Sequence, residues 1–218
     1  MEIINDETKR LQENDVTNIY IHCSNAQVNV FSNPELSELE VASQFCKVEV
    51  IAEDGEIVIS EQNLTEGAEN VLEIELPINK KIKSLFCTTE NGNVSIKDCN
   101  IEKIKVKTEN GAIAIESKFK MLEINTRKGK TVVASKNSED SEIELRSESG
   151  NINLTMQDVK FYDVSIKNNY GDTYIEHSTK TVVKKNLKKD IKIKPNNANK
   201  VYEVKGKIRT NSGTILIH

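Results

Sequence analysis

A short motif centred on glycine recurs along this chain, and its spacing constrains the fold more than any other feature. The clearest copies are TTENGNVSIKD at 88–98, KTENGAIAIES at 107–117 and RSESGNINLTMQD at 146–158. The aligned glycines are Gly55, Gly92, Gly111, Gly129, Gly150, Gly171 and Gly213, with gaps of 37, 19, 18, 21, 21 and 42 residues. Two gaps are close to twice the others, so the sequence predicts a repeat of about 20 residues.

Apolar side chains recur at fixed distances from each glycine, seven and five residues before it and two and four residues after it. Five residues before the glycines stand Val50, Cys87, Val106, Ile124, Leu145, Ile166 and Ile208. Four residues after them stand Ile59, Ile96, Ile115, Val133, Leu154, Ile175 and Ile217. The position seven residues before the last glycine holds Gly206 instead of an apolar residue. This alternation predicts two short strands around each turn, each with one buried face.

A small, mostly polar residue stands three positions before each glycine. The set is Ala52, Thr89, Thr108, Thr126, Ser147, Asn168 and Thr210. Short hydroxyl and amide side chains at a strand end bind the backbone of the following turn. The glycine itself is expected to supply a positive φ.

These columns predict an all-β fold, a right-handed parallel β-solenoid of about 20 residues per coil, with about ten coils and each coil covering the next. A propeller needs about 40 residues per blade, and a sandwich of hairpins needs no identical columns at fixed offsets. We expect one solenoid domain over residues 17–218, with strands beginning near residue 18. Residues 1–16 are expected to form a tail or a short helical cap. The chain stops at TILIH, directly after a strand, so an uncovered edge there favours end-to-end self-association.

Composition argues against several classes of function. The net charge is −4, which gives no general attraction to nucleic acid or to an anionic membrane. No run of 18 apolar residues and no signal-peptide pattern is present, so both a cytoplasmic and an envelope location stay open. The four cysteines lack zinc-site spacing and are expected to be free, buried thiols.

No motif for catalysis or cofactor binding is found, so no catalytic residue, metal or cofactor is predicted. Acidic residues stand beside four turns, at Asp54, Glu90, Glu109 and Glu148. One carboxylate per turn is too few for a calcium site, which needs six to eight oxygen ligands, so solvated turns are expected.

Two basic features are candidates for an interaction surface. Lys107, Arg146, Lys167 and Arg209 stand four residues before their glycines and point outward, with glutamates at 123 and 144 nearby. A second segment, 180–194, is rich in lysine and includes Lys184, Lys185, Lys188 and Lys189. Such a patch fits anionic glycopolymers, lipid headgroups or a partner's acidic surface. The alternative is a soluble face whose lysines discourage edge aggregation.

The run LEIELPINKKIKSLFCTTENGNVSI at 72–96, followed by T-x-N-G-x-I-x-I units, resembles the bacterial putative-adhesin domain family of unknown function. The resemblance covers roughly residues 17–218. It implies a parallel β-solenoid, no established enzymatic activity and a role at or near the cell envelope. The family has no agreed binding residues, so none is transferred to this chain.

Together these observations favour a non-catalytic, adhesin-like interaction or scaffold module associated with the bacterial envelope, binding a protein or an anionic polymer. One alternative is a polysaccharide-acting enzyme, which would need carboxylates converging in a groove. Another is an intracellular sensing or regulatory module that binds a partner protein.

Overall fold

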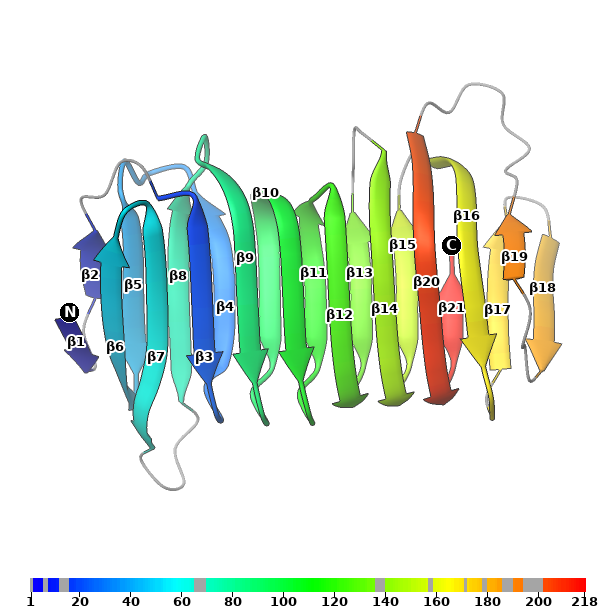
Figure 1. Ribbon diagram of the computed structural model, residues 1–218, viewed down its shortest axis with the longest axis horizontal. Helices are drawn as coiled ribbons and strands as arrows, with labels where there is room; N and C mark the ends of the chain where they lie inside the picture. The colour runs from blue at the N-terminus through cyan, green and yellow to red at the C-terminus, as the bar shows by residue number, and fades with distance from the viewer. Residues whose placement is uncertain are drawn as a thin grey trace.

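The chain folds into two long β-sheets packed face to face, which one bent strand joins into a single hydrogen-bonded array, seen in the computed structural model of Figure 1. The structure describes residues 2–5, 8–11, 16–64, 70–135, 140–156, 159–170, 172–177, 180–185, 190–193 and 202–218. The described part contains 21 strands and no helix. At most corners the chain passes from one sheet to the other, as expected for a solenoid-like all-β fold, and the sheets stay open at both ends.

The front sheet faces the viewer in Figure 1, and each of its strands pairs with the next in spatial order. The strands are β1 (Glu2–Asn5), β6 (Cys46–Glu53), β7 (Glu56–Leu64), β3 (Asn18–Cys23), β9 (Lys81–Thr89), the second part of β10 (Val94–Thr108), β12 (Met121–Lys128), β14 (Ser141–Ser149), β20 (Tyr202–Ser212), β16 (Val159–Asn168) and β19 (Asp190–Ile193).

The back sheet has a matching order. Its strands are β2 (Thr8–Leu11), β5 (Leu39–Gln44), β8 (Val71–Pro77), β4 (Gln27–Asn33), the first part of β10, β11 (Ile113–Lys118), β13 (Thr131–Ser135), β15 (Ile152–Met156), β21 (Ile215–Ile217), β17 (Asp172–His177) and β18 (Lys180–Lys185).

The predicted parallel, in-register pairing is confirmed from β7 to β16 in front and from β8 to β17 behind. One buried front column runs through Ile59, Ile21, Cys87, Val106, Ile124, Leu145, Ile208 and Ile166. One buried back column runs through Ile74, Val30, Ile96, Ile115, Val133, Leu154 and Ile217. Each such aliphatic side chain contributes about 1.5–3 kcal/mol of burial free energy, so a thin core without tryptophan suffices.

The spatial order of the coils differs from their sequence order at both ends, which corrects the expectation of simple succession. The first long coil, β3 with β4, lies between β7–β8 and β9–β10. The last coil, β20 with β21, lies between β14–β15 and β16–β17. The C-terminal strand is therefore paired on both sides, and the uncovered edge expected there was wrong.

Gly55 belongs to a hairpin and not to a solenoid turn, which is a second correction. β6 and β7 pair antiparallel within the front sheet, and the turn between them places Asp54 at φ 50° and Gly55 at φ 78°. Two positive φ values in succession are typical of a tight type I′ hairpin. As a result, Ile57 and Ile59 stack on Ile19 and Ile21 of β3, in the front columns and not in the back ones.

The N-terminal residues that the structure describes are strands, so the predicted helical cap was wrong. β1 pairs antiparallel with β6, and β2 pairs antiparallel with β5. Ile4 and Leu11 are buried, so these two strands extend the core at this end of the stack.

The repeated turns depend on the hydroxyl column as predicted. The Oγ1 atoms of Thr89 and Thr108 accept hydrogen bonds from the backbone N–H groups of Gly92 and Gly111, each at 3.0 Å. Positive φ is found at Gly129 and Gly213 but not at Gly92, Gly111 or Gly150. At those three positions glycine is needed for another reason, because a Cβ would lie 1.9 Å from a backbone oxygen of the adjacent coil.

All four thiols are free and buried, as predicted. Burial raises the pKa of Cys87 to about 12 and that of Cys99 to about 11, and it raises the pKa of Cys23 further still. Cys99 lies at the corner where β10 passes from the back sheet to the front, beside Asp98 at φ 54°. The raised pKa values keep these groups protonated and unreactive at neutral pH.

Candidate functional site

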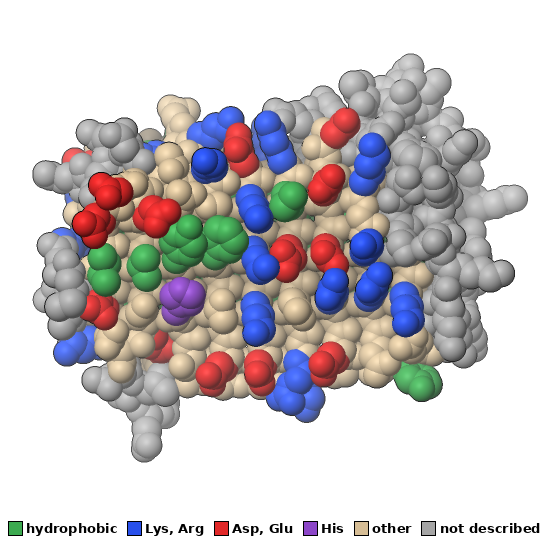
Figure 2. All heavy atoms as spheres, viewed as in Figure 1, with side chains coloured by type: hydrophobic (Ala, Val, Ile, Leu, Met, Phe, Trp, Pro, Cys, Tyr) green, Lys and Arg blue, Asp and Glu red, His purple; other side chains and the backbone are tan. Residues whose placement is uncertain are grey.

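The outer face of the front sheet carries side chains in straight rows that cross the strands. Figure 2 shows this face, with most of its Lys and Arg side chains over β10 to β16. Equivalent residues of adjacent strands stand side by side because the strands are parallel and in register. The four predicted basic residues share one such row, which we call the basic row and which runs through Lys107, Asn125, Arg146, Arg209 and Lys167.

The intercalated C-terminal coil makes the basic row continuous. Arg146 pairs in register with Arg209, and Arg209 pairs with Lys167, so three cations occupy three neighbouring strands. Sequence order would have placed Arg146 next to Lys167. Lys107 is set apart from these three by Asn125 on β12. All four basic side chains are exposed, as predicted.

Most cations of the basic row are not neutralised by the protein. Arg146 forms an ion pair with Glu144 two residues earlier on its own strand. Among the residues that the structure describes, Lys107, Arg209 and Lys167 have no ion-pair partner. Exposed charges this close repel one another weakly, and the repulsion falls when an anion binds between them.

The rows on either side of the basic row differ from it in charge. The row above contains charges of both signs, with Lys105, Glu123, Glu144 and Lys207 in spatial order, and Lys105 pairs with Glu123 at 2.9 Å. The row below contains Glu109, Arg127 and Glu148, of which Glu109 pairs with Arg127 at 3.3 Å. The basic row is therefore a strip of positive charge only one side chain wide.

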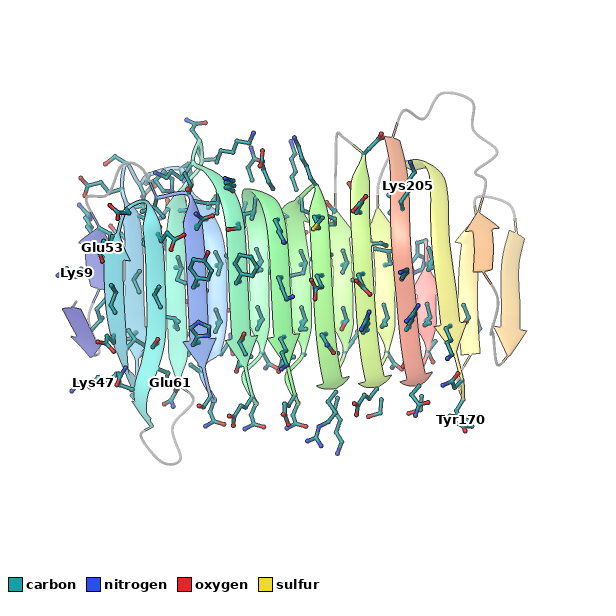
Figure 3. The ribbon with its side chains drawn as sticks, viewed as in Figure 1. Lys9, Lys47, Glu53, Glu61, Tyr170 and Lys205 are labelled. Carbon is teal, nitrogen blue, oxygen red and sulfur yellow. The ribbon has the colours of Figure 1, made fainter. Side chains whose placement is uncertain are left out.

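The row that contains Glu109, Arg127 and Glu148 ends at two asparagines, Asn211 and Asn169, which were not predicted as site residues from the sequence. Asn169 Nδ2 donates a hydrogen bond to Asn211 Oδ1 at 2.8 Å, joining the strand ends beyond Lys167 and Arg209. Similar amide pairs join Asn91 to Asn25 and Asn110 to Asn91 at other turns. Tyr170, at the turn after β16, is 77% exposed and projects from the lower edge of the sheet in Figure 3.

The second predicted basic feature is only partly within the described residues. Lys184 and Lys185 lie in β18, which pairs antiparallel with β17, and only their backbone is described. Lys188 and Lys189 lie outside the described residues. These four lysines therefore stay a prediction.

The N-terminal half of the same face has a different character. Ile51, Val58, Tyr20 and Phe86 form one apolar row across four strands, continued by Lys105. The rings of Tyr20 and Phe86 stack with centroids 5.2 Å apart, and Lys103 Nζ lies 5.5 Å from the Phe86 centroid. The basic and apolar parts of the face are thus separate.

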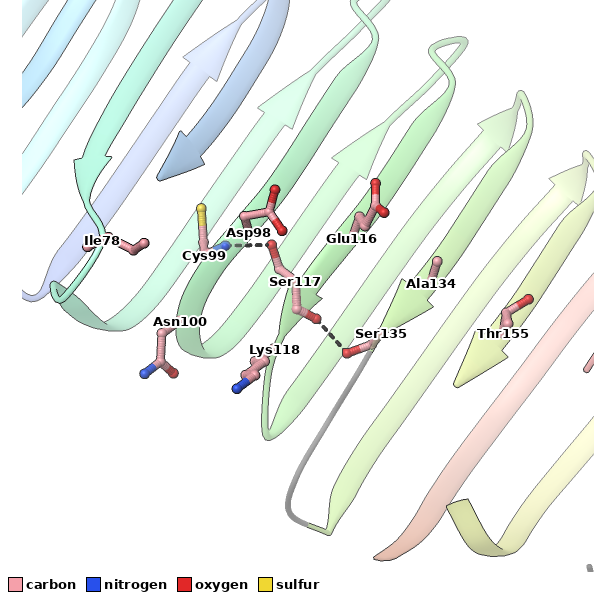
Figure 4. Close-up of a pocket in the computed structure, with 10 residues that line it drawn as sticks. All are labelled: Ile78, Asp98, Cys99, Asn100, Glu116, Ser117, Lys118, Ala134, Ser135 and Thr155. Atoms are coloured by element: carbon pink, nitrogen blue, oxygen red, sulfur yellow. Dashed lines mark hydrogen bonds between the residues drawn. The ribbon is translucent and has the colours of Figure 1, made fainter. Parts of the chain in front are cut away.

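A groove of about 380 Å³ follows the corner between the two sheets, shown in Figure 4. Asp98, Glu116 and Lys118 line it with several small residues. Its base is held by two hydrogen bonds, from Cys99 N to Ser117 Oγ at 3.1 Å and from Ser135 Oγ to Ser117 O at 2.5 Å. Asp98 and Glu116 stand on neighbouring strands, so this is the place that a carboxylate pair would occupy in an enzyme.

Two further properties concern only the described part of the chain. It contains no cluster of three or more His, Cys, Asp or Glu side chains able to hold a metal ion. It also contains no helix long and apolar enough to cross a membrane.

Comparison with known proteins identifies the family. The model of the Toastrack DUF4097 family matches residues 15–218. The chain belongs to the Toastrack DUF4097 family. The resemblance to the bacterial adhesin domain family expected from the glycine turns is therefore confirmed.

Two solved structures share the fold of this Toastrack chain. A putative cell adhesion protein from Clostridium sporogenes is 13% identical with a TM-score of 0.58, and the match covers 97% of each chain. A putative adhesin from Bacteroides fragilis is 12% identical with a TM-score of 0.51, covering 100% of this chain and 97% of the other. None of the curated proteins compared with the chain matches it.

Proposed function

We propose that this Toastrack domain is a non-catalytic, adhesin-like interaction module of the bacterial cell envelope, and that it binds through the outer face of its front sheet. The observation that carries the proposal is the continuous run of Arg146, Arg209 and Lys167 on three neighbouring strands. The adhesion-related names of the two structurally similar proteins support the same class of function.

The architecture suits such a module. We propose a right-handed coil of about 20 residues per turn, in which core columns fix the outward rows at the strand spacing of about 4.8 Å. Outward residues then change without disturbing the core, so binding is spread over several coils. Because the backbone beneath the row is fixed by the sheet, only the side chains lose conformational entropy when the face binds a partner.

Catalysis is the less favoured function because the corner groove offers little to support it. Asp98 and Glu116 are both exposed to solvent, whereas an active site typically encloses its reacting groups and excludes water. The charges of the basic row lie on the front face and not in this groove.

The proposed partner is an anionic polymer of the envelope, with an acidic protein surface as the alternative. Charge complementarity to an unneutralised basic row steers association and makes it sensitive to salt. End-to-end association of copies stays a prediction, but the C-terminal strand no longer supports it, because both edges of that strand are paired.

Co-sedimentation with isolated cell walls and membranes, at low and high salt, tests this function. The test variant carries Lys107→Glu, Arg209→Glu and Lys167→Glu. The control carries Lys97→Glu, Lys118→Glu and Lys130→Glu, which make the same charge change at exposed positions off the front face. We expect salt-sensitive binding that the first variant loses and the control keeps. Absence of binding at any salt, or equal loss in both variants, would contradict the proposal and direct the search to a soluble protein partner.

A further inference from the structure

We infer that the basic row binds a linear acidic polysaccharide that runs along the stack, across the strands, with its anionic groups on Arg146, Arg209 and Lys167. This inference rests on the proposed function and names the class of partner. Because the three residues stand on adjacent strands in register, their backbone positions repeat at about 4.8 Å along one line. That spacing is comparable with the length of one sugar unit, so one carboxylate, phosphate or sulfate per sugar matches one cation per strand.

The chemistry of the row suits oxyanions. A guanidinium binds a carboxylate or phosphate through two parallel hydrogen bonds, and an ammonium adds a point charge. Arg209 and Lys167 have no ion-pair partner in the described part of the chain, so binding them requires no internal ion pair to be broken. Arg146 remains close to Glu144, which aligns its guanidinium along the strand.

The basic row is only one side chain wide, which favours a polymer chain over a membrane surface as its partner. Glu123 and Glu144 lie in the row above, and Glu109 and Glu148 lie in the row below. Lys105, Lys207 and Arg127 balance all but one of these carboxylates, so neither row adds net positive charge, and a flat anionic membrane pressed against all three rows would meet net positive charge only in the middle one. A single extended chain lies along the middle row and reaches the adjoining rows only at its edges.

The amide pair at the end of the strip favours a sugar chain over other polyanions. Asn211, near the end of β20, and Asn169, directly after β16, stand two residues beyond Arg209 and Lys167, where β14 has Glu148. After the hydrogen bond between them, Asn211 Nδ2 and Asn169 Oδ1 have no partner among the described residues. One donor and one acceptor beside two cations suit the hydroxyl groups of an acidic sugar.

The experiment measures binding of the full chain to four probes by isothermal titration at low and moderate salt. The first is polygalacturonate, which has one carboxylate per sugar, and the second is its methyl-esterified form, which has the same backbone without the charges. The third is a vesicle of phosphatidylglycerol, and the fourth is a single-stranded oligothymidylate. We expect binding to polygalacturonate alone, weakened by salt.

Three variants test the row itself. Arg209→Glu breaks its centre and should weaken polygalacturonate binding about ten-fold or more, since one charge-assisted contact is lost and a repulsion is added. Lys207→Glu makes the same change on the same strand in the neighbouring row and should weaken binding by less than about three-fold. Asn125→Lys fills the gap between Lys107 and Arg146 and should tighten binding several-fold.

The outcomes separate this inference from the proposed function. If the chain sediments with cell walls but does not bind polygalacturonate, the proposed function stands and the inference that its partner is an acidic polysaccharide is wrong. Equal binding to vesicles or to oligothymidylate would overturn the inference, because a general polyanion or membrane surface would then explain the row. Equal losses of affinity in Arg209→Glu and Lys207→Glu, or no gain of affinity in Asn125→Lys, would show that the polymer does not bind along the basic row.

Discussion

The backbone of Gly111 lies so close to the carbonyl of Gly92 that a Cβ on Gly111 would stand 1.9 Å from that oxygen. The same close approach recurs between Gly92 and Ala26 and between Gly150 and Gly129. The glycine turns are thus stacked on one another along the rod. This contact explains why glycine recurs at positions where φ is not positive.

Gly111→Ala should therefore destabilise the protein strongly, because the obstructing atom belongs to the backbone and cannot rotate away. We expect a loss of about 3 kcal/mol or more in the free energy of unfolding, measured by urea titration. Ala112→Ser, at the exposed neighbouring position, is the matched control and should change stability little. A Gly111→Ala protein as stable as its control would show that the turns are not packed this tightly.

Thr108→Val should cost about 1–2 kcal/mol of folding stability, since the shape is kept but the buried Gly111 N–H loses its acceptor. Thr88→Val makes the same change at an exposed position of β9 and should have little effect. Thermal unfolding of both variants measures the difference. Equal melting temperatures would mean that the hydroxyl column contributes nothing to the turns.

The sequence predicted the parts of the fold that depend on local pattern. Alternating apolar residues around the glycines identified the buried faces, and the same alternation placed Lys107 and Arg209 outside.

What the sequence could not predict depends on contacts between distant segments. Every coil has similar strand edges, so no local sequence pattern indicates that β20 lies between β14 and β16. The Asp54–Gly55 pair is a known hairpin signal and could have revealed the antiparallel β6–β7 turn. The continuity of the basic row follows from the coil order and was therefore beyond prediction.

Ile115→Asp should unfold the central coils, because Ile115 is 1% exposed and an aspartate there would be a buried, unpaired charge. The expected loss exceeds about 4 kcal/mol, visible as a lowered or absent unfolding transition in circular dichroism. Lys107→Glu, on the exposed face, should leave that transition within about 0.5 kcal/mol of the parent. An unchanged transition in Ile115→Asp, or a large loss in Lys107→Glu, would mean that the two faces are reversed.

The buried thiols predict a loss of stability in alkali. Their pKa values in the folded protein, about 12 for Cys87 and about 11 for Cys99, exceed the ordinary value of 9.0. Above pH 9 the unfolded chain therefore releases protons that the folded chain keeps, and folding weakens between pH 9 and the folded pKa values. We expect about 1 kcal/mol lost per thiol per pH unit in that window.

Urea titrations at pH 8 and pH 10 measure this loss, with Cys87→Ala as the comparison. The variant is less stable at pH 8, because it loses buried volume, but its stability should fall less between the two pH values. A pH dependence identical to that of the parent protein would contradict burial as the cause.

The position of Arg209 decides whether the basic row exists, because the row is continuous only if β20 lies between β14 and β16. The measurement is disulfide formation in two double variants, Arg146→Cys with Arg209→Cys and Arg146→Cys with Lys167→Cys, read by peptide mapping without reductant. Adjacent strands place the first pair about 4.8 Å apart, within reach of a disulfide, whereas the second pair is about twice as far apart, beyond the limit of about 7 Å. We expect a bridge between 146 and 209 and none between 146 and 167. A bridge in the variant with cysteines at 146 and 167, and none in the variant with cysteines at 146 and 209, would show that the coils stack in sequence order. That result would contradict the continuous row.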